Sequence, residues 1–469
     1  TKIWNFIPNT VFGDRPINPM NNKLKKIGLL GGDIIVLYVS LYFTLLIRYF
    51  NADLLAVHFW PFSIIFLLWL IIFYIANLYN LNLAINNFIF FQISSKALIV
   101  ASLTSVAFFY LIPNIGIAPK RILFIYIIVF SLLFYFWRQF YNWSLKVYLP
   151  KNKLAIIGYN KLVEELIKEL QKKTHLGYII SLIANNTNKN NEINNIPVIK
   201  DLAGLPELIK KDKITSIIFT NDPHQSPELC AALFNCLPLK INYFSLPDFY
   251  EIITGRIPLG AINQMWFLEK LNEGNKIWFD CFKRFYDFCL ALIILLITLP
   301  FWLIIAIIIK ITDQGSIFFI MKRLGKNHKI FNLIKFRTMH EKNNNYSPTC
   351  VNDLRITKFG SFLRKTRIDE LPQILNIIKG EMSFIGPRPE RPEIAKELEK
   401  QIPFYNERSL IKPGLSGSDQ VSGEYHSPSQ EDSLKKLQYD LFYIKNRSIY
   451  LDLSIILKTI ATVISRSGI

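Results

Sequence analysis

The sequence predicts a protein of fold class membrane α plus α/β, in which apolar helices precede water-facing structure. Three observations predict this class. The chain of 469 residues is 51% hydrophobic, four apolar runs crowd its first third, and strand-like and helix-like segments alternate from Leu154 onward. A water-soluble fold does not need several apolar runs of about 20 residues each. We therefore expect the first third of the chain to lie in a bilayer.

The apolar runs predict a four-helix transmembrane bundle. Each run is long enough to cross a hydrocarbon core, which takes roughly 20 helical residues, and the connecting loops are short. We assign residues 1–22 to an N-terminal segment and residues 23–149 to the transmembrane domain. Asp33 lies inside the first run, where an acid is costly, and we expect it to make a polar contact between helices. The runs are Ile27–Ile47, Val57–Tyr79, Ile93–Ile112 and Ile122–Tyr141.

The basic residues predict the orientation and the kind of partner. Lys23, Lys25 and Lys26 precede the first run, which places that end in the cytoplasm, and four spans return the chain to the same side. Lys120 and Arg121, before the fourth run, weaken this signal without reversing it. The net charge of +19 indicates an anionic partner. No groove-reading motif accompanies it, so we expect no nucleic acid but rather membrane lipids and phosphorylated substrates.

Alternating strands and helices predict a Rossmann-like α/β domain over residues 150–247. Its first strand and turn read LAIIGYN, in which Gly158 is the one glycine available for close approach of a phosphate. Nucleotide binding needs more glycines at this turn, so a structural or regulatory module is the favoured interpretation. Residues 248–275 are rich in aromatic side chains and predict an amphipathic connector that lies on a membrane or on the next domain.

A fifth apolar run, residues 288–309, predicts a re-entrant membrane helix at the start of an α-rich domain of residues 276–469. Lys283 and Arg284 precede this run and Lys310 follows it, so both ends suit the same leaflet. Pro300 near the middle removes a backbone hydrogen bond and bends the helix. A kinked hairpin explains these features. The alternative is a plain fifth span with an incidental proline.

The window Phe362–Pro389 reads FLRKTRIDELPQILNIIKGEMSFIGPRP and contains the residues that we expect to be catalytic. Its adjacent carboxylates, Asp369 and Glu370, suit metal binding or nucleophilic attack, and its arginines suit phosphate. Pro372 favours a helix first turn, so the carboxylates are expected near a helix N-terminus that lowers their pKa. The alternative is that Asp369 only caps this helix. The arginines are Arg364, Arg367 and Arg388.

Six sequence blocks in order carry a resemblance to a known family. They include this window, the segment of residues 288–309, KRFYDF at Lys283–Phe288 and KRLGKNHKIFNLIKFRTM at Lys322–Met339. KPGLSGSDQVSG at Lys412–Gly423 and LDLSIILKTI at Leu451–Ile460 complete the set. Together they closely resemble the monotopic polyprenyl-phosphate phosphoglycosyl transferases of bacteria. The four preceding spans and the α/β domain resemble the long form of that family.

The resemblance implies transfer of a sugar-1-phosphate from a UDP-sugar to undecaprenyl phosphate, with release of UMP. In the family, the first acid of the pair is the nucleophile and carries the phosphosugar covalently, a role that falls on Asp369. Glu370 assists a Mg²⁺ site, and the division of metal binding between Asp369 and Glu370 stays open. The family opens O-antigen, capsule or exopolysaccharide synthesis at the bacterial inner membrane, with its catalytic domain in the cytoplasm.

The resemblance also names the substrate-binding residues. Arg364 and Arg388 match the phosphate-binding arginines of the family, and Lys335 and Arg337 are expected to help them. Arg391 either extends the phosphate site or is an exposed charge. Long-form members dimerise, so a homodimer is implied. The alternatives are a non-catalytic membrane scaffold or regulator that keeps the fold, and an enzyme that modifies nucleotide sugars through the α/β domain. The sequence does not identify the sugar.

Overall fold

A computed structural model divides the chain into two compact units, Thr1–Thr254 and Gly255–Ile469. The described residues are 19–50, 54–76, 78–79, 88–111, 120–148, 152–172, 177–185, 192–194, 196–202, 204–223, 226–271, 276–313, 315–340, 353, 355–422 and 429–464. Residues 1–18 of the predicted N-terminal segment lie outside this set, and residues 19–22 begin the first helix. Each unit has hydrophobic cores of its own.

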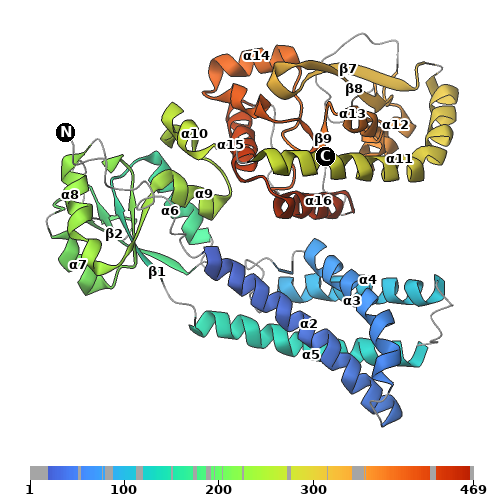
Figure 1. The fold of residues 1–469 in the computed structure, drawn as a ribbon, viewed down its shortest axis with the longest axis horizontal. Helices are drawn as coiled ribbons and strands as arrows, with labels where there is room; N and C mark the ends of the chain where they lie inside the picture. Colours follow the sequence, from blue (N-terminus) through green and yellow to red (C-terminus); the bar gives the residue numbers. More distant parts are fainter. Residues whose placement is uncertain are drawn as a thin grey trace. The chain divides into compact units, whose positions relative to one another are not determined.

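Four long apolar helices occupy the predicted membrane region of the first unit. They are α2 (Pro19–Tyr49), α3 (Leu55–Ile75), α4 (Phe88–Leu111) and α5 (Lys120–Tyr148), and each contains a segment long and apolar enough to cross a membrane. α2 packs along α5, and α3 packs against α4 (Figure 1). With the α/β sheet described below, these helices confirm the fold class of membrane α plus α/β.

A buried ion pair joins α2 to α5. Asp33 Oδ2 lies 2.5 Å from Nη2 of Arg138, and both side chains are almost fully buried. Nη1 of Arg138 donates a hydrogen bond of 2.8 Å to the carbonyl oxygen of Leu78, beyond the end of α3. Gly32 lets the Trp137 ring lie close, because a Cβ at Gly32 would be 1.8 Å from that ring. Asp33 therefore makes the interhelical contact expected from the sequence.

Removing one partner of this pair should destabilise the bundle. Asp33→Ala leaves the Arg138 guanidinium buried without its counter-charge, which costs about 3 kcal/mol. We expect a clearly lower unfolding temperature for the detergent-solubilised chain. Ile35→Ala, an exposed position of the same helix, is the matched control. Adding Arg138→Met to Asp33→Ala should recover most of the loss. Equal unfolding temperatures for Asp33→Ala and Ile35→Ala would show that the pair has no stabilising role.

The α/β part of the first unit is a six-stranded sheet in the order β3-β4-β2-β1-β5-β6, parallel except for the pair β3–β4. Residues of β1 alternate between two cores: Leu154 and Ile156 face α6 and α9, whereas Ala155 and Ile157 face α7 and α8. Helices thus cover both faces, as a Rossmann-like domain requires. The strands are β1 (Asn152–Ile157), β2 (Tyr178–Ala184), β3 (Glu192–Ile193), β4 (Ile196–Ile199), β5 (Ser216–Phe219) and β6 (Asn242–Ser245), and the helices are α6 (Lys161–Lys172), α7 (Leu205–Asp212), α8 (Pro227–Asn235) and α9 (Leu246–Thr254).

The stretch predicted as a connector, residues 248–275, contributes to both units. Phe249 and Tyr250 of α9 belong to a core of the α/β sheet. Trp266, in α10 (Gln264–Lys270), belongs to the main core of the second unit. Residues 272–275 lie outside the described set.

The second unit consists of a β-hairpin and a two-stranded parallel sheet, with helices packed around them (Figure 1). The hairpin joins β7 (Phe318–Leu324) to β8 (Ile330–Phe336), and the parallel pair is β9 (Ser383–Ile385) with β10 (Gly414–Ser416). The helices are α11 (Ile277–Asp313), α12 (Lys358–Lys365), α13 (Gln373–Lys379), α14 (Pro392–Gln401), α15 (Gln430–Asn446) and α16 (Ile449–Ile464). The short 3₁₀ turns include η10 (Ile368–Glu370) and η11 (Tyr405–Leu410).

α11 is longer than the predicted run of residues 288–309 and is sharply bent (Figure 1). Pro300 lies inside it, where its ring removes a backbone hydrogen bond. In the arm before the bend, Arg284 donates to the carbonyl oxygens of Ile377 and Ile378 at 2.6 Å each. In the arm after the bend, Trp302 packs in a core with Phe336 and Leu363, among others. Both arms of α11 therefore pack against other elements of the second unit.

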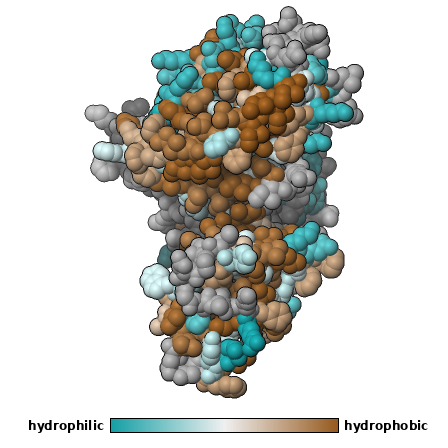
Figure 2. Space-filling model, turned by 90° about the vertical axis from the view of Figure 1, so that its right-hand side faces the viewer, coloured by the Kyte–Doolittle hydropathy of each residue, from teal (hydrophilic) through white to brown (hydrophobic). Residues whose placement is uncertain are grey.

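The bend of α11 carries a hydrophobic surface that the second unit does not cover. Exposed apolar side chains occur on both sides of Pro300, including Leu296, Ile297, Phe301 and Leu303. Figure 2 views the side on which the second arm lies and shows a broad hydrophobic area there. An uncovered apolar surface of this kind indicates contact with a membrane or another protein.

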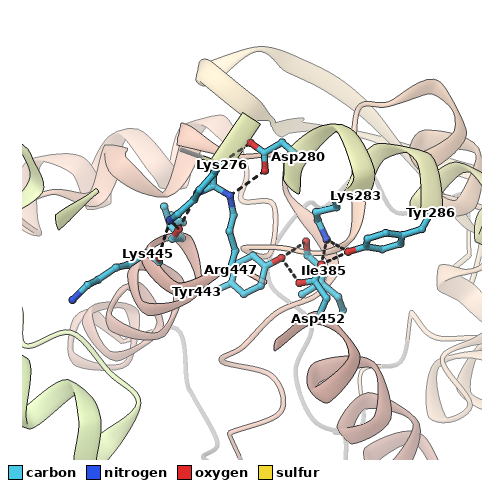
Figure 3. Close-up of polar contacts among 10 residues, drawn as sticks. Lys276, Asp280, Lys283, Tyr286, Ile385, Tyr443, Lys445, Arg447 and Asp452 are labelled. Carbon is cyan, nitrogen blue, oxygen red and sulfur yellow. Dashed lines mark hydrogen bonds and ion pairs between the residues drawn. The ribbon is translucent and has the colours of Figure 1, made fainter. Parts of the chain in front are cut away.

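A buried polar network fastens the first arm of α11 to the C-terminal helices (Figure 3). Lys283 Nζ lies 2.5 Å from Oδ2 of Asp452, in α16, and the Tyr286 hydroxyl donates to the same oxygen. Tyr443, in α15, donates to Oδ1 of Asp452 at 2.6 Å. Lys283 comes from the first block of the resemblance and Asp452 from the last, so the network joins the two ends of the second unit.

Candidate active site

The two predicted carboxylates lie on η10, a 3₁₀ turn immediately before α13. Arg367 starts this turn with a φ of +58°. The Asp369 residue is 7% exposed and Glu370 is 9% exposed, so both are buried. Pro372 is the residue before α13, which agrees with the predicted position near a helix start. The buried turn holds both acids in one place on the protein.

Glu370 is surrounded by three cations that the sequence analysis named. Its Oε1 lies 2.7 Å from Nζ of Lys335, 3.2 Å from Nη2 of Arg388 and 3.9 Å from Nη1 of Arg367. Burial alone would raise the pKa of Glu370, but Arg388, Lys335 and Arg367 outweigh it and lower that pKa to about 2. Glu370 is therefore ionised at neutral pH.

A buried amide sets the position of Lys335 relative to η10. Asn376, in α13, accepts a hydrogen bond of 3.2 Å from the Ile334 amide and donates one of 2.7 Å to the carbonyl oxygen of Asn332. These two contacts fasten β8 to the helix that follows the carboxylates. The register of β8 then places Lys335 against Glu370.

Asp369 differs from Glu370 although the two are adjacent. Asp369 Oδ1 is buried and has no hydrogen-bond partner among the residues that the structure describes. Burial raises the pKa of Asp369, Lys335 opposes this increase, and the charge of Glu370 adds to it. The predicted lowering of this pKa by a helix N-terminus is therefore wrong for Asp369. The reason is that burial removes the carboxyl from water, which raises its pKa. The opposing effect of α13 is small because this helix has only seven residues.

The other predicted substrate residues lie around this pair at different positions. Nε of Arg364 donates a hydrogen bond of 2.8 Å to Oγ1 of Thr338, and the Arg364 charge interacts favourably with Asp369. Arg337 donates to Ser316 and so contacts the segment before β7. Arg391 is the cap residue of α14, three positions beyond Arg388. The structure thus brings Lys335, Arg367 and Arg388 onto Glu370, whereas Arg337 contacts Ser316 and Arg391 begins α14.

Two arginines that the sequence analysis missed hold the Pro-Arg-Pro loop. Nη2 of Arg408 donates a hydrogen bond of 3.0 Å to the carbonyl oxygen of Arg388. Nη1 of Arg323 donates one of 3.1 Å to the carbonyl oxygen of Pro389. Arg408 also forms a buried ion pair of 2.8 Å with Asp440. Both arginines lie in or beside sequence blocks of the resemblance, but spacing alone does not reveal that they bind backbone oxygens of this loop.

The donor set of the site fits a magnesium ion that is held mainly by its substrate. Mg²⁺ is often bound through one or two carboxylates together with phosphate oxygens and water. The buried Oδ1 of Asp369 can supply such a ligand. Within the described part of the chain, no group of three or more His, Cys, Asp or Glu side chains could hold a metal. A metal bound here by two carboxylates would therefore need the phosphates of a substrate.

The turn after β1 packs closely against the end of β5. Gly158 has a φ of +92°, and a Cβ there would lie 1.9 Å from Oγ1 of Thr220. Thr220 follows β5, so its side chain lies at the point between β1 and β5 where α/β sheets of this type bind ligands. Asn160 caps α6 by accepting a hydrogen bond of 3.0 Å from the Val163 amide. The structural or regulatory role of the domain stays a prediction.

Comparison with known proteins identifies the family. The model of the bacterial sugar transferase family matches residues 278–466, and a CoA-binding domain family matches residues 75–233. The exopolysaccharide production protein ExoY of Rhizobium meliloti is 36% identical over 207 residues, which cover 40% of this chain and 87% of that protein. The chain belongs to the bacterial sugar transferase family, as the six blocks predicted.

Two longer relatives carry specific activities in their names. UDP-N-acetylgalactosamine-undecaprenyl-phosphate N-acetylgalactosaminephosphotransferase of Aeromonas hydrophila is 34% identical over 238 residues, 50% of this chain and 55% of that protein. UDP-glucose:undecaprenyl-phosphate glucose-1-phosphate transferase of Xanthomonas campestris pv. campestris is 38% identical over 283 residues, 58% of this chain and 57% of that protein. The match spans about half the length of these two relatives.

The low pKa of Glu370 predicts a specific pH dependence of stability. A carboxyl whose pKa falls from 4.5 to about 2 on folding contributes about 3 kcal/mol at neutral pH. That contribution is present above pH 4.5 and is lost as the pH falls towards 2. We expect the difference in unfolding free energy between the full chain and its Glu370→Gln variant to shrink over this range. A difference that stays constant from pH 7 to pH 2 would contradict the cation cluster around Glu370.

Proposed function

We propose that the chain transfers a sugar-1-phosphate from a UDP-sugar to undecaprenyl phosphate and releases UMP. This reaction would be the first membrane step of O-antigen, capsule or exopolysaccharide synthesis. The observation that carries the proposal is the buried, unpaired Oδ1 of Asp369 beside a carboxylate held by three cations. The activities in the names of the two longer relatives support the same reaction class.

The proposed reaction has two displacements at one phosphorus atom. First, an Asp369 carboxylate oxygen attacks the β-phosphorus of the UDP-sugar. The bond between that phosphorus and the bridging oxygen breaks, and UMP leaves with that oxygen. An oxygen of the acceptor phosphate then attacks the same phosphorus. The Asp369–phosphorus bond breaks, the carboxylate is regenerated, and the product is a polyprenyl diphosphate sugar. Each half is a phosphoryl transfer, which depends chiefly on positioning and charge neutralisation.

The residues around Asp369 have distinct roles in this scheme. Burial makes the Asp369 carboxylate poorly hydrated, so fewer water molecules must be displaced before it attacks. Glu370 holds Lys335 and Arg388 next to the Asp369 carboxylate. These two cations would offset the negative charge of the substrate phosphates, together with Arg364 and Arg367. A bound Mg²⁺ would supply further charge neutralisation at the diphosphate. Arg391 would extend the cationic surface beyond Arg388.

A substitution at Asp369 tests the proposed nucleophile. Asp369→Asn keeps the size of the side chain but removes its negative charge, so we expect UMP release to fall by about a thousandfold or more. The wild-type chain, incubated with the UDP-sugar and no acceptor, should gain the mass of a phosphosugar, and the variant should not. Glu397→Gln, an exposed acid on α14, is the charge-matched control.

UMP release by Asp369→Asn at the wild-type rate would contradict the proposed mechanism. A wild-type chain that releases no UMP from any of a panel of UDP-sugars would favour the alternative, a non-catalytic scaffold or regulator. The same panel identifies the sugar. The two longer relatives name different sugars, glucose and N-acetylgalactosamine, so membership of the family does not fix it.

α11 is proposed to enter and leave the cytoplasmic leaflet of the bacterial inner membrane. Its two arms bind the same unit, and the apolar side chains around Pro300 are exposed. A straight span would have to pull the second arm away from Phe336 and Leu363. A hairpin of this kind would keep Asp369 in the cytoplasm, where a soluble UDP-sugar and a lipid phosphate can meet. The homodimer implied by the resemblance stays a prediction, which crosslinking in intact membranes would test.

Labelling of residues that flank α11 tests this topology. Glu269 and Thr312 are exposed polar positions before and near the end of the helix. In a variant whose five native cysteines are replaced by serine, Glu269→Cys and Thr312→Cys should both react with an impermeant thiol reagent only after the cytoplasmic side is opened. Labelling of the two positions from opposite sides would instead establish a plain fifth span.

A further inference from the structure

A second cationic site lies at the end of α11, beside the base of the β7–β8 hairpin. The groove there has a volume of about 540 Å³ and is lined by Lys310, the segment Ser316–Ile320 and Arg337. Arg337 is fixed in place by its side-chain contact with Ser316 and by a hydrogen bond of 2.9 Å from its amide to the carbonyl oxygen of Ile317. Lys310 is exposed to solvent. The groove therefore presents two positive charges from two different elements.

The groove is linked to the carboxylates through β8 and its continuation. Lys335 and Arg337 are two positions apart on the continuation of β8, so their side chains leave the same face of the strand about 7 Å apart. Lys335 contacts Glu370 at 2.7 Å. Arg337 thus lies two positions along the chain from the lysine that contacts Glu370, and it lines the groove at the end of α11.

Exposed apolar side chains occur in the groove and on the helix arm that ends at it. Ile307 and Ile311 are 59% and 77% exposed and belong to the same arm of α11 as Lys310. Ile320 in the groove is 58% exposed. The hydrophobic area in Figure 2 lies on this side of the second unit. Such a surface combines charge for a phosphate with an uncovered path for a hydrocarbon chain.

The remaining cations lie on a different loop. Arg388 and Arg391 belong to the Pro-Arg-Pro loop and its continuation, which Arg323 and Arg408 hold through backbone oxygens. No residue of this loop lines the groove. Arg388 and Arg391 on the loop therefore form one set of cations, and Lys310 and Arg337 in the groove form another.

We propose that the groove at the end of α11 binds the acceptor lipid, with Lys310 and Arg337 contacting its phosphate and its prenyl chain lying along the second arm of α11. This inference rests on the proposed function and divides its site in two. The loop set receives the diphosphate of the UDP-sugar, and the groove set receives the lipid phosphate. Only the groove set adjoins an uncovered apolar surface, which a soluble nucleotide does not need.

The test separates the two Michaelis constants. Lys310→Gln and Arg337→Gln each remove one charge from the groove, and Lys322→Gln removes an exposed charge from the same hairpin outside it. We expect the KM for undecaprenyl phosphate to rise about fivefold in Lys310→Gln and about tenfold in Arg337→Gln. The KM for the UDP-sugar should change by less than about twofold, and Lys322→Gln should leave both constants as in the wild type. Arg337→Lys, which keeps the charge, should recover most of the acceptor affinity.

A binding measurement distinguishes failure of this inference from failure of the proposed function. Native mass spectrometry of the purified full chain should detect bound undecaprenyl phosphate in the wild type and less of it in both groove variants. Equal rises in both KM values, or unchanged retention of undecaprenyl phosphate, would overturn the assignment of the groove while UMP release still supports the enzyme. Displacement of the acceptor by an equal concentration of phosphatidylglycerol would show a general lipid surface and would also overturn it. Binding of the acceptor without any UMP release would instead contradict the proposed function.

Discussion

The contacts of Glu370 with Lys335, Arg367 and Arg388 join three segments of the second unit at the candidate site. One carboxylate oxygen collects cations from β8, from η10 itself and from the loop after β9. A buried charge without partners is strongly unfavourable, so these three segments are held together by the need to compensate it. The same burial has the opposite result one residue earlier, where the Asp369 oxygen is left without a hydrogen bond. A carboxylate with three cationic partners thus lies next to one whose buried oxygen accepts no hydrogen bond. The second carboxylate, Asp369, is the nucleophile in the proposed mechanism.

Much of this site could be predicted because its residues lie in short, distinctive blocks. Asp369, Glu370, Arg367 and Arg388 share one window, and the structure brings Lys335 to them from another. Burial could not be predicted, since it depends on how β8 and α13 pack around the turn, and the sequence-based direction of the Asp369 pKa was therefore wrong. The supporting contacts of Arg323 and Arg408 escaped notice for a related reason. They end on backbone oxygens, which have no sequence signature.

The fold was predictable where hydrophobic runs are long and less so where helices are amphipathic. The four N-terminal helices follow directly from the long apolar runs. The α/β sheet follows from the alternation of strand-like and helix-like hydrophobic patterns. α11 starts at Ile277, well before its apolar run, because its first turns alternate exposed side chains with polar anchors such as Lys283. The transition from α/β sheet to second unit is similar. Phe249 and Trp266 are both aromatic, yet they belong to different cores, and only the tertiary structure separates them.

The network at Asp452 has a consequence for the order in which the protein is made. Its partners Lys283 and Asp452 are separated by 169 positions in the chain, and Tyr443 joins them from the preceding helix. A ribosome delivers the first arm of α11 long before α16, so until α16 emerges the Lys283 ammonium lacks its ion-pair partner Asp452. The carboxylates, β8 and the Pro-Arg-Pro loop are already synthesised by then. Completion of this network therefore waits for α16, the latest of these segments to be synthesised.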